Sequence, residues 1–114
     1  MLINTGYDFR PGGEPEKRRA AVMFKAFALM GVDCVTLSER EFVFGPAYLR
    51  ELAATTPVPL VCANVRDMRG THTDSTYFMS YLRLERAGKR VLLTSVVDPK
   101  KAPQLTRQGL EVDD

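Results

Sequence analysis

Apolar residues recur at helical spacing in two stretches of the chain. In the first, at about 14–30, Pro15 suits the opening helical turn and Gly31 follows the last turn. The second, at 45–54, also has a proline in its opening turn and an inner face of leucine and alanine. Both stretches have start and stop signals at the expected ends, so the pattern predicts two helices.

Short runs of β-branched and other apolar residues lie before, between and after these helices. They occupy 1–4, 32–37 and 60–63, and glycine, proline or polar residues bound them. The order is strand, helix, strand, helix, strand. Right-handed crossovers turn this order into a parallel sheet, so we predict an α/β fold with the helices packed on one face.

A β-hairpin is predicted after the third strand. The run 77–85 alternates in polarity, 86–89 supplies a turn, and 90–97 returns as the more apolar strand, which we expect to be more buried. The polar segment 64–76 is typical of a long exposed loop.

The last stretch, 100–114, has a weak apolar pattern in Leu105 and Leu110 and no capping signal at its end. We therefore expect 1–114 to form a single partial domain of a larger protein.

Composition excludes several classes of protein. The chain has 114 residues, 45% of them apolar, and 16 basic against 14 acidic residues give a charge of +2. That describes a globular domain with a core, and its short basic clusters argue against nucleic-acid binding. We find no apolar run long enough for a membrane span and no signal-peptide pattern. Cys34 and Cys62 lack metal or redox spacing and are interpreted as buried small hydrophobic residues.

Any site of an open α/β sheet should lie beyond the carboxyl ends of the strands. Here that edge comprises the loops 5–13, 38–45 and 64–75. The pattern alone leaves the chemistry of these loops open.

Charged residues gather in the second of these loops. Glu39 and Glu41 flank Arg40, and this cluster could bind a metal, act as acid and base, or simply be solvated. His72 is the only histidine of the chain, and an isolated loop histidine is more typical of a surface residue than of a ligand.

Three segments resemble the calcineurin-like metallophosphoesterases of the 5'-nucleotidase type. The sequence GVDCVTLSEREFVFGPAYLREL at 31–52 is similar to the family's strand, GNHEFD-type loop and FGxxxLxEL helix. PLVCANV at 59–65 is similar to its PxLSANV strand, and RAGKRVLLTSVVDP at 86–99 is similar to its NGxKIGVIGLTTP hairpin. The likeness runs in order through residues 2 to 114 and implies a partial metallophosphoesterase sheet with helices on one face. The opposite face and one edge would be exposed where the rest of the family's fold packs, which would favour self-association.

This resemblance implies a two-metal hydrolase, in which two divalent cations such as Mn²⁺ or Zn²⁺ clamp a phosphate and activate water. The family's metal-binding Asn and phosphate-contacting His fall at Glu39 and Arg40. A glutamate can ligate a hard cation and an arginine can bind phosphate. The family's bridging Asp falls at Tyr7 without a gap, or at Asp8 after a slip of one residue. The resemblance therefore implies Asp8 and Glu39 as metal ligands and Arg40 as the catalytic phosphate contact.

Two functional hypotheses follow from the resemblance. The chain is either a segment of a 5'-nucleotidase-like phosphoesterase, inactive by itself, or a non-catalytic binding or structural module derived from that fold. In the first case its partner is a phosphate ester such as a nucleotide, and the family implies a periplasmic or exported protein. The altered residues at positions 7, 39 and 40 suggest the second case.

Overall fold

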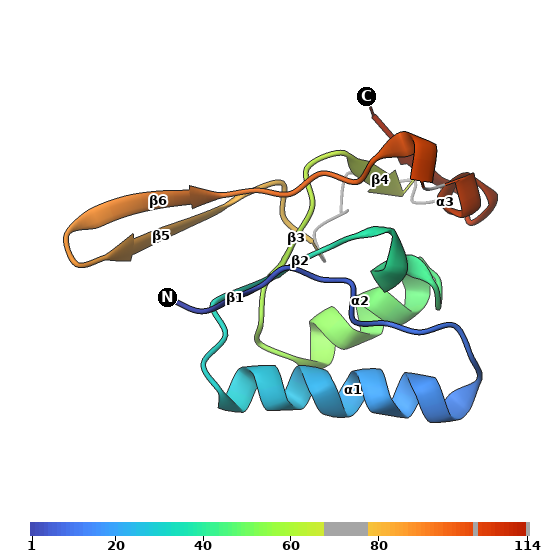
Figure 1. Cartoon of the computed structure of the whole chain (residues 1–114), viewed down its shortest axis with the longest axis horizontal. Helices are drawn as coiled ribbons and strands as arrows, with labels where there is room; N and C mark the ends of the chain where they lie inside the picture. Colours follow the sequence, from blue (N-terminus) through green and yellow to red (C-terminus); the bar gives the residue numbers. More distant parts are fainter. Residues whose placement is uncertain (68–77, 102, 114) are drawn as a thin grey trace.

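A three-stranded parallel sheet forms the centre of the computed structural model, which describes residues 1–67, 78–101 and 103–113 (Figure 1). The strands are β1 (Ile3–Asn4), β2 (Cys34–Thr36) and β3 (Leu60–Val61), in the order β1-β2-β3. Ile3 lies opposite Cys34, and Val35 lies opposite Leu60. The predicted strand, helix, strand, helix, strand order is confirmed.

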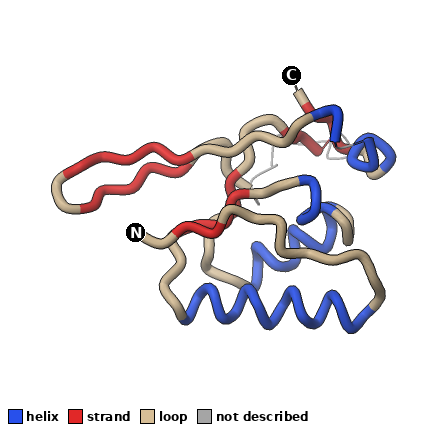
Figure 2. The backbone as a smooth tube through the Cα atoms, in the orientation of Figure 1, coloured by secondary structure: helices blue, strands red, loops and turns tan. Residues whose placement is uncertain are grey.

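Both predicted helices cover the same face of this sheet. They are α1 (Glu14–Leu29) and α2 (Pro46–Thr55), and Figure 2 shows them on one side of the parallel strands. The core lies between these layers, where Phe24 from α1, Leu49 from α2 and Phe9 from the loop after β1 are buried. Full burial of each such side chain contributes about 1.5–3 kcal/mol. The α/β class and the single helical layer are therefore as predicted.

A fourth segment extends the sheet beyond β3. Met79 pairs with Val61 in a parallel bridge, and its backbone N–H donates to the carbonyl of Leu60 at 2.7 Å. The backbone N–H of Cys62 donates in turn to the carbonyl of Met79 at 2.8 Å.

Cys62 and Cys34 are buried free thiols, which confirms that they act as small core residues.

The predicted hairpin forms, but it is shorter and more exposed than expected. Its strands are β5 (Leu82–Arg86) and β6 (Lys89–Leu93), and the turn residues Ala87 and Gly88 both have positive φ, as a type I′ turn requires. The returning strand is not the more buried one: Leu92 is 63% exposed. The expectation was wrong because the hairpin extends away from the helical layer, so no core covers it (Figure 1).

Short elements complete the described part of the chain. They are η1 (Glu39–Phe42), β4 (Val65–Asp67), η2 (Pro99–Lys101), α3 (Pro103–Arg107) and β7 (Leu110–Val112). β4 pairs with β7 in an antiparallel ladder, so the segment predicted as one long loop from 64 begins with a strand. Leu105 and Leu110 are fully buried beside it, which shows that the weak pattern near the C-terminus belongs to the core.

None of the helices in the described part of the chain is long and apolar enough to cross a membrane. The expected self-association through exposed surface stays a prediction.

Candidate functional site

The loops that follow β1 and β2 meet at the carboxyl edge of the sheet. Gly6, in the first loop, has a φ of 74°, and a Cβ atom there would lie 2.3 Å from the carbonyl oxygen of Thr36. Only glycine permits both the left-handed backbone and this close approach. That Cβ atom would also lie 3.3 Å from the backbone nitrogen of Ser38, so the two loops that were expected to carry the site are in direct contact.

A buried carboxylate joins these two loops. Glu41 is 1% exposed, and its Oε1 accepts the backbone N–H of Asp8 at 2.7 Å. Its Oε2 accepts the backbone N–H of Ser38 at 2.9 Å and the Ser38 hydroxyl at 2.6 Å. The bonds to Ser38 form a capping box at the start of η1. Glu41 thus has a structural role that the charge cluster did not indicate, although the spacing of Ser38 and Glu41 is the sequence signature of such a cap.

Asp8 lies at the junction of the two loops. Burial raises the pKa of its carboxyl above the ordinary value, the nearby Glu41 carboxylate raises it further, and the Asn4 side chain lowers it in part. Its Oδ2 atom is buried and has no hydrogen-bond partner among the described residues. The surroundings of Asp8 therefore disfavour the ionised form of its carboxyl group.

Arg40 and Tyr7 stack at the surface of the same junction. The Arg40 guanidinium carbon lies 4.0 Å from the centroid of the Tyr7 ring, and Tyr7 itself adopts a positive φ of 75°. Ser38 Oγ accepts the backbone N–H of Arg40 at 3.2 Å, so the cap also fixes the backbone that carries the arginine. The exposed guanidinium is held in place and keeps donors for a ligand.

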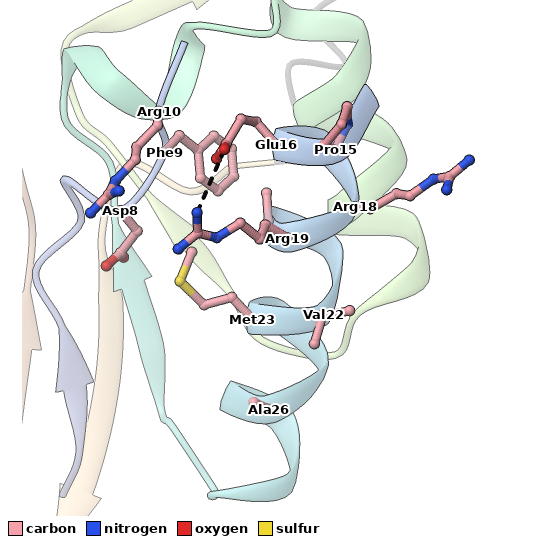
Figure 3. A pocket seen from close by; sticks show the side chains of 11 residues that line it. Asp8, Phe9, Arg10, Pro15, Glu16, Arg18, Arg19, Val22, Met23 and Ala26 are labelled. Carbon is pink, nitrogen blue, oxygen red and sulfur yellow. Dashed lines mark ion pairs between the residues drawn. The ribbon is translucent and has the colours of Figure 1, made fainter. Parts of the chain in front are cut away.

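The two sequence-predicted metal ligands face different hollows. Asp8 lines a groove of about 600 Å³ between the loop after β1 and helix α1. Figure 3 shows Asp8 and Arg10 on one side of that groove and Arg19 and Met23 of α1 on the other. Glu39 lines a separate hollow beside η1, together with Arg40. Arg40 and Glu39 thus line the same hollow, whereas Asp8 lines the other one.

Asn64, the first residue of the third predicted loop, has a structural role. Asn64 donates to the carbonyls of Val97 at 2.8 Å and Asp113 at 2.9 Å, and it accepts the backbone N–H of Val97 at 2.8 Å. It therefore ties the end of β3 to the segment after the hairpin and to the end of β7. His72 lies outside the described residues.

The donors present do not make a two-metal centre. Among the residues that the structure describes, no group of three or more His, Cys, Asp and Glu side chains could hold a metal ion. Glu41 uses its oxygens to join the two loops, and Asp8 and Glu39 line different hollows. Asp8 offers one buried oxygen without a partner, which is one donor where a dinuclear site needs several. No hydrolytic step through metal is therefore derived from these residues.

Comparison with known proteins identifies the fold. No protein-family model matches the chain, and no curated protein matches it significantly in sequence. Among solved structures it is similar to a 5'-nucleotidase precursor from Thermus thermophilus, with a TM-score of 0.78 and 20% identity over 100% of this chain and 22% of that one.

Two further structures give the same result. The calcineurin-like phosphoesterase YfkN from Bacillus subtilis matches with a TM-score of 0.68 and 18% identity, over 100% of this chain and 40% of that one. A Staphylococcus aureus protein designated a 5'-nucleotidase, solved with alpha-ketoglutarate, matches with a TM-score of 0.60 and 17% identity, over 97% of this chain and 22% of that one.

The chain thus has the fold of part of a calcineurin-like phosphoesterase of the 5'-nucleotidase type, as the sequence resemblance implied. It spans between about a fifth and two fifths of the length of these three proteins. At this level of identity the likeness concerns the fold, and the chemistry has to be argued from the residues of the site.

Replacing Glu41 with Ala should lower the free energy of unfolding by about 3 kcal/mol, because it leaves two backbone N–H groups at the junction of the loops without their acceptor. Glu41→Gln should lose less, since its amide oxygen can still accept one of them. Chemical denaturation measures both values. The exposed Glu51→Ala, on α2, is the matched control and should change stability by less than about 0.5 kcal/mol. A Glu41→Ala protein as stable as the control would contradict this role.

Asp8→Asn should stabilise the protein at neutral pH. The raised pKa means that the folded state binds the Asp8 proton more tightly than the unfolded chain, whose aspartate has a pKa near 3.8. Stability therefore falls as the pH rises from that value through the folded pKa, and the asparagine removes this loss. In thermal melts between pH 3 and 8, the melting temperature of Asp8→Asn should rise above that of the unmodified protein from about pH 4. Parallel curves over the whole range would show that the ionised form of Asp8 does not destabilise the folded protein.

Proposed function

We propose that the chain is a segment of a phosphoesterase-type protein, that its carboxyl-edge loops bind a phosphate ester such as a nucleotide, and that the segment alone does not hydrolyse it. The observation that carries this proposal is the arrangement of Arg40. It is exposed, it is fixed over Tyr7, and it forms no ion pair with the described residues. A guanidinium with free donors at this edge of a parallel sheet is suited to a phosphate group.

The raised pKa of Asp8 and its buried oxygen without a partner support a site at the same edge. An acid whose ionised form destabilises the fold is typical of functional positions, because a site that binds a ligand need not be optimal for stability. If the longest natural form of the protein binds divalent cations of the Mn²⁺ or Zn²⁺ type, Asp8 and Glu39 would each supply one carboxylate to a different cation, because they line separate hollows. The other donors would have to come from residues beyond those that the structure describes.

A non-catalytic binding or structural module is the second candidate. It is favoured by the separation of Asp8 and Glu39 into different hollows and by the commitment of Glu41 to the loop junction. On this hypothesis the protein retains the sheet and the phosphate-binding arginine without a metal centre. The two candidates differ in whether the longest natural form of the protein hydrolyses phosphate esters in the presence of manganese.

Arg40→Ala should weaken the binding of inorganic phosphate or of a nucleoside monophosphate by about tenfold or more, because charge-assisted hydrogen bonds are lost. The melting temperature should fall by no more than about 5 °C, since the side chain is exposed and its stacking on Tyr7 contributes about 1 kcal/mol or less. Calorimetric titration measures the affinity. Arg90→Ala, on the exposed hairpin, is the control for loss of one positive charge. Equal affinities of the Arg40 and Arg90 variants would exclude Arg40 as the phosphate contact.

In the longest natural form of the protein, Asp8→Asn and Glu39→Gln should each lower the affinity for Mn²⁺. Each variant removes one charged oxygen ligand and keeps the shape of the side chain. Electron paramagnetic resonance of free Mn²⁺ gives the affinity directly, and Glu51→Gln on α2, which lines neither hollow, controls for a general loss of negative charge. Unchanged affinity in both site variants would exclude these carboxylates as ligands and would favour the non-catalytic module.

A further inference from the structure

The backbone at Tyr7 is strained. Tyr7 has a φ of 75°, in the left-handed region that a bulky side chain rarely adopts. Among the described residues other than glycine, Ala87 also has a positive φ, and the tight turn of the β5–β6 hairpin requires it there. Tyr7 lies in the loop between β1 and α1, where no hairpin turn accounts for it. A glycine would adopt the same backbone without strain.

Two hydrogen bonds, one on each side of Tyr7, hold this backbone in place. The N–H of Gly6 donates to the side-chain oxygen of Asn4 at 2.7 Å, and the N–H of Asp8 donates to Oε1 of Glu41 at 2.7 Å. A rotation of the Tyr7 backbone to an ordinary conformation would move one of these N–H groups away from its acceptor. The surrounding structure therefore maintains the strain.

Packing in the core does not account for the position of the Tyr7 ring. The residue is 56% exposed, so the burial of apolar surface offsets little of the strain. Backbone strain of this kind is typical of functional positions, where the neighbouring structure imposes a conformation that the residue alone would not adopt. At Tyr7 this conformation places the ring against Arg40, whose guanidinium carbon lies 4.0 Å from the ring centroid.

The stack restrains the Arg40 side chain and leaves its donors free. An arginine has many rotamers, and a side chain that is already held in its binding conformation loses less entropy when a ligand binds. The N–H donors of a guanidinium lie in its plane, whereas the Tyr7 ring covers one of its faces. An oxyanion can therefore reach the edge of the guanidinium while the ring stays in contact.

A purely structural explanation of Tyr7 fits less well. The close approach to the carbonyl oxygen of Thr36 requires a glycine at position 6, and the Asp8 group that Glu41 binds belongs to the backbone. Neither contact needs a side chain at position 7. A glycine there would preserve both contacts and remove the strain, so the tyrosine is explained by the contact that its ring makes.

We propose that Tyr7 is a positioning residue of the anion site: its backbone is held in the left-handed region so that its ring restrains Arg40 for an oxyanion such as phosphate. The inference rests on the proposed function, because it takes Arg40 as the phosphate contact. It adds Tyr7 to the site and implies that the fold is less stable with tyrosine at this position than its backbone alone would allow.

The strain is tested with two variants that both remove the ring. Tyr7→Gly and Tyr7→Ala lose the same contact with Arg40 and differ in whether the residue accepts a positive φ. Glycine is ordinarily the less stable of the two, but here Tyr7→Gly should melt about 4 °C above Tyr7→Ala. A Tyr7→Gly protein that melts at or below the temperature of Tyr7→Ala would show that position 7 is not strained and would overturn the inference.

The restraint of Arg40 is measured without any ligand, by NMR relaxation of its Nε–H group in the 114-residue chain. The group should be rigid in the unmodified protein and in Tyr7→Phe, which keeps the ring, and mobile in Tyr7→Ala and Tyr7→Gly. Titration with inorganic phosphate should then show about fivefold weaker binding for the last two variants, and rescue of the affinity in Tyr7→Phe. Ala87→Gly relieves a positive φ in the distant hairpin turn and should leave the phosphate affinity unchanged.

The outcomes separate this inference from the function on which it rests. If Tyr7 acts through Arg40, then Tyr7→Ala should cause no further loss of phosphate affinity in a protein that already carries Arg40→Ala. A loss of affinity in Arg40→Ala but not in Tyr7→Ala, or an Arg40 side chain equally mobile in all variants, would overturn the inference and leave phosphate binding by Arg40 intact. If phosphate binding does not depend on Arg40, the proposed function fails and the inference fails with it.

Discussion

The buried carboxylate of Glu41 hydrogen-bonds to the backbone of both loops that form the site, and this adds to the stacking of Arg40 on Tyr7 and to the ring contact between Phe9 and Phe44. Parallel pairing brings the ends of β1 and β2 to one edge, but it leaves the backbone N–H groups of Asp8 and Ser38 beyond the ladder. Glu41 accepts both, and its burial makes those bonds hard to replace with water. The carboxylate thus fixes the backbone of Asp8 directly. It also fixes Ser38, whose hydroxyl oxygen accepts the backbone N–H of Arg40.

The same constraint determines the electrostatics of the edge. Burial raises the pKa of Asp8, and the charge of Glu41, which lies under the loops, raises it further. Because the cap orients η1, Arg40 is placed over Tyr7, where its guanidinium remains available. The three similar structures share the sheet that permits this arrangement, at 17–20% identity. At this level of identity the likeness shows the fold alone, so function has to be argued from the residues of the site.

The regular elements could be predicted because each one has a complete local signal. Proline and glycine bound the two helices, and β-branched runs mark the strands. The short elements η1 and α3 were missed because four or five residues carry too little periodicity, although the capping box at Ser38 was readable. The burial of β6 was wrongly predicted, since alternation does not say whether a face is covered. Which hollow Asp8 or Glu39 would face depends on loop packing, which no sequence pattern encodes.

Amide hydrogen exchange at Asp8 tests most directly whether Glu41 holds the two loops together. Asp8 lies in a loop outside every strand and helix, so its N–H has no reason to be protected except the bond to Glu41. The account predicts slow exchange at Asp8 and Ser38 in the unmodified chain, and fast exchange at both when Glu41 is replaced by Ala, while the core of α1 stays protected. Exchange at the rate of an unfolded chain at Asp8 in the unmodified protein would contradict it.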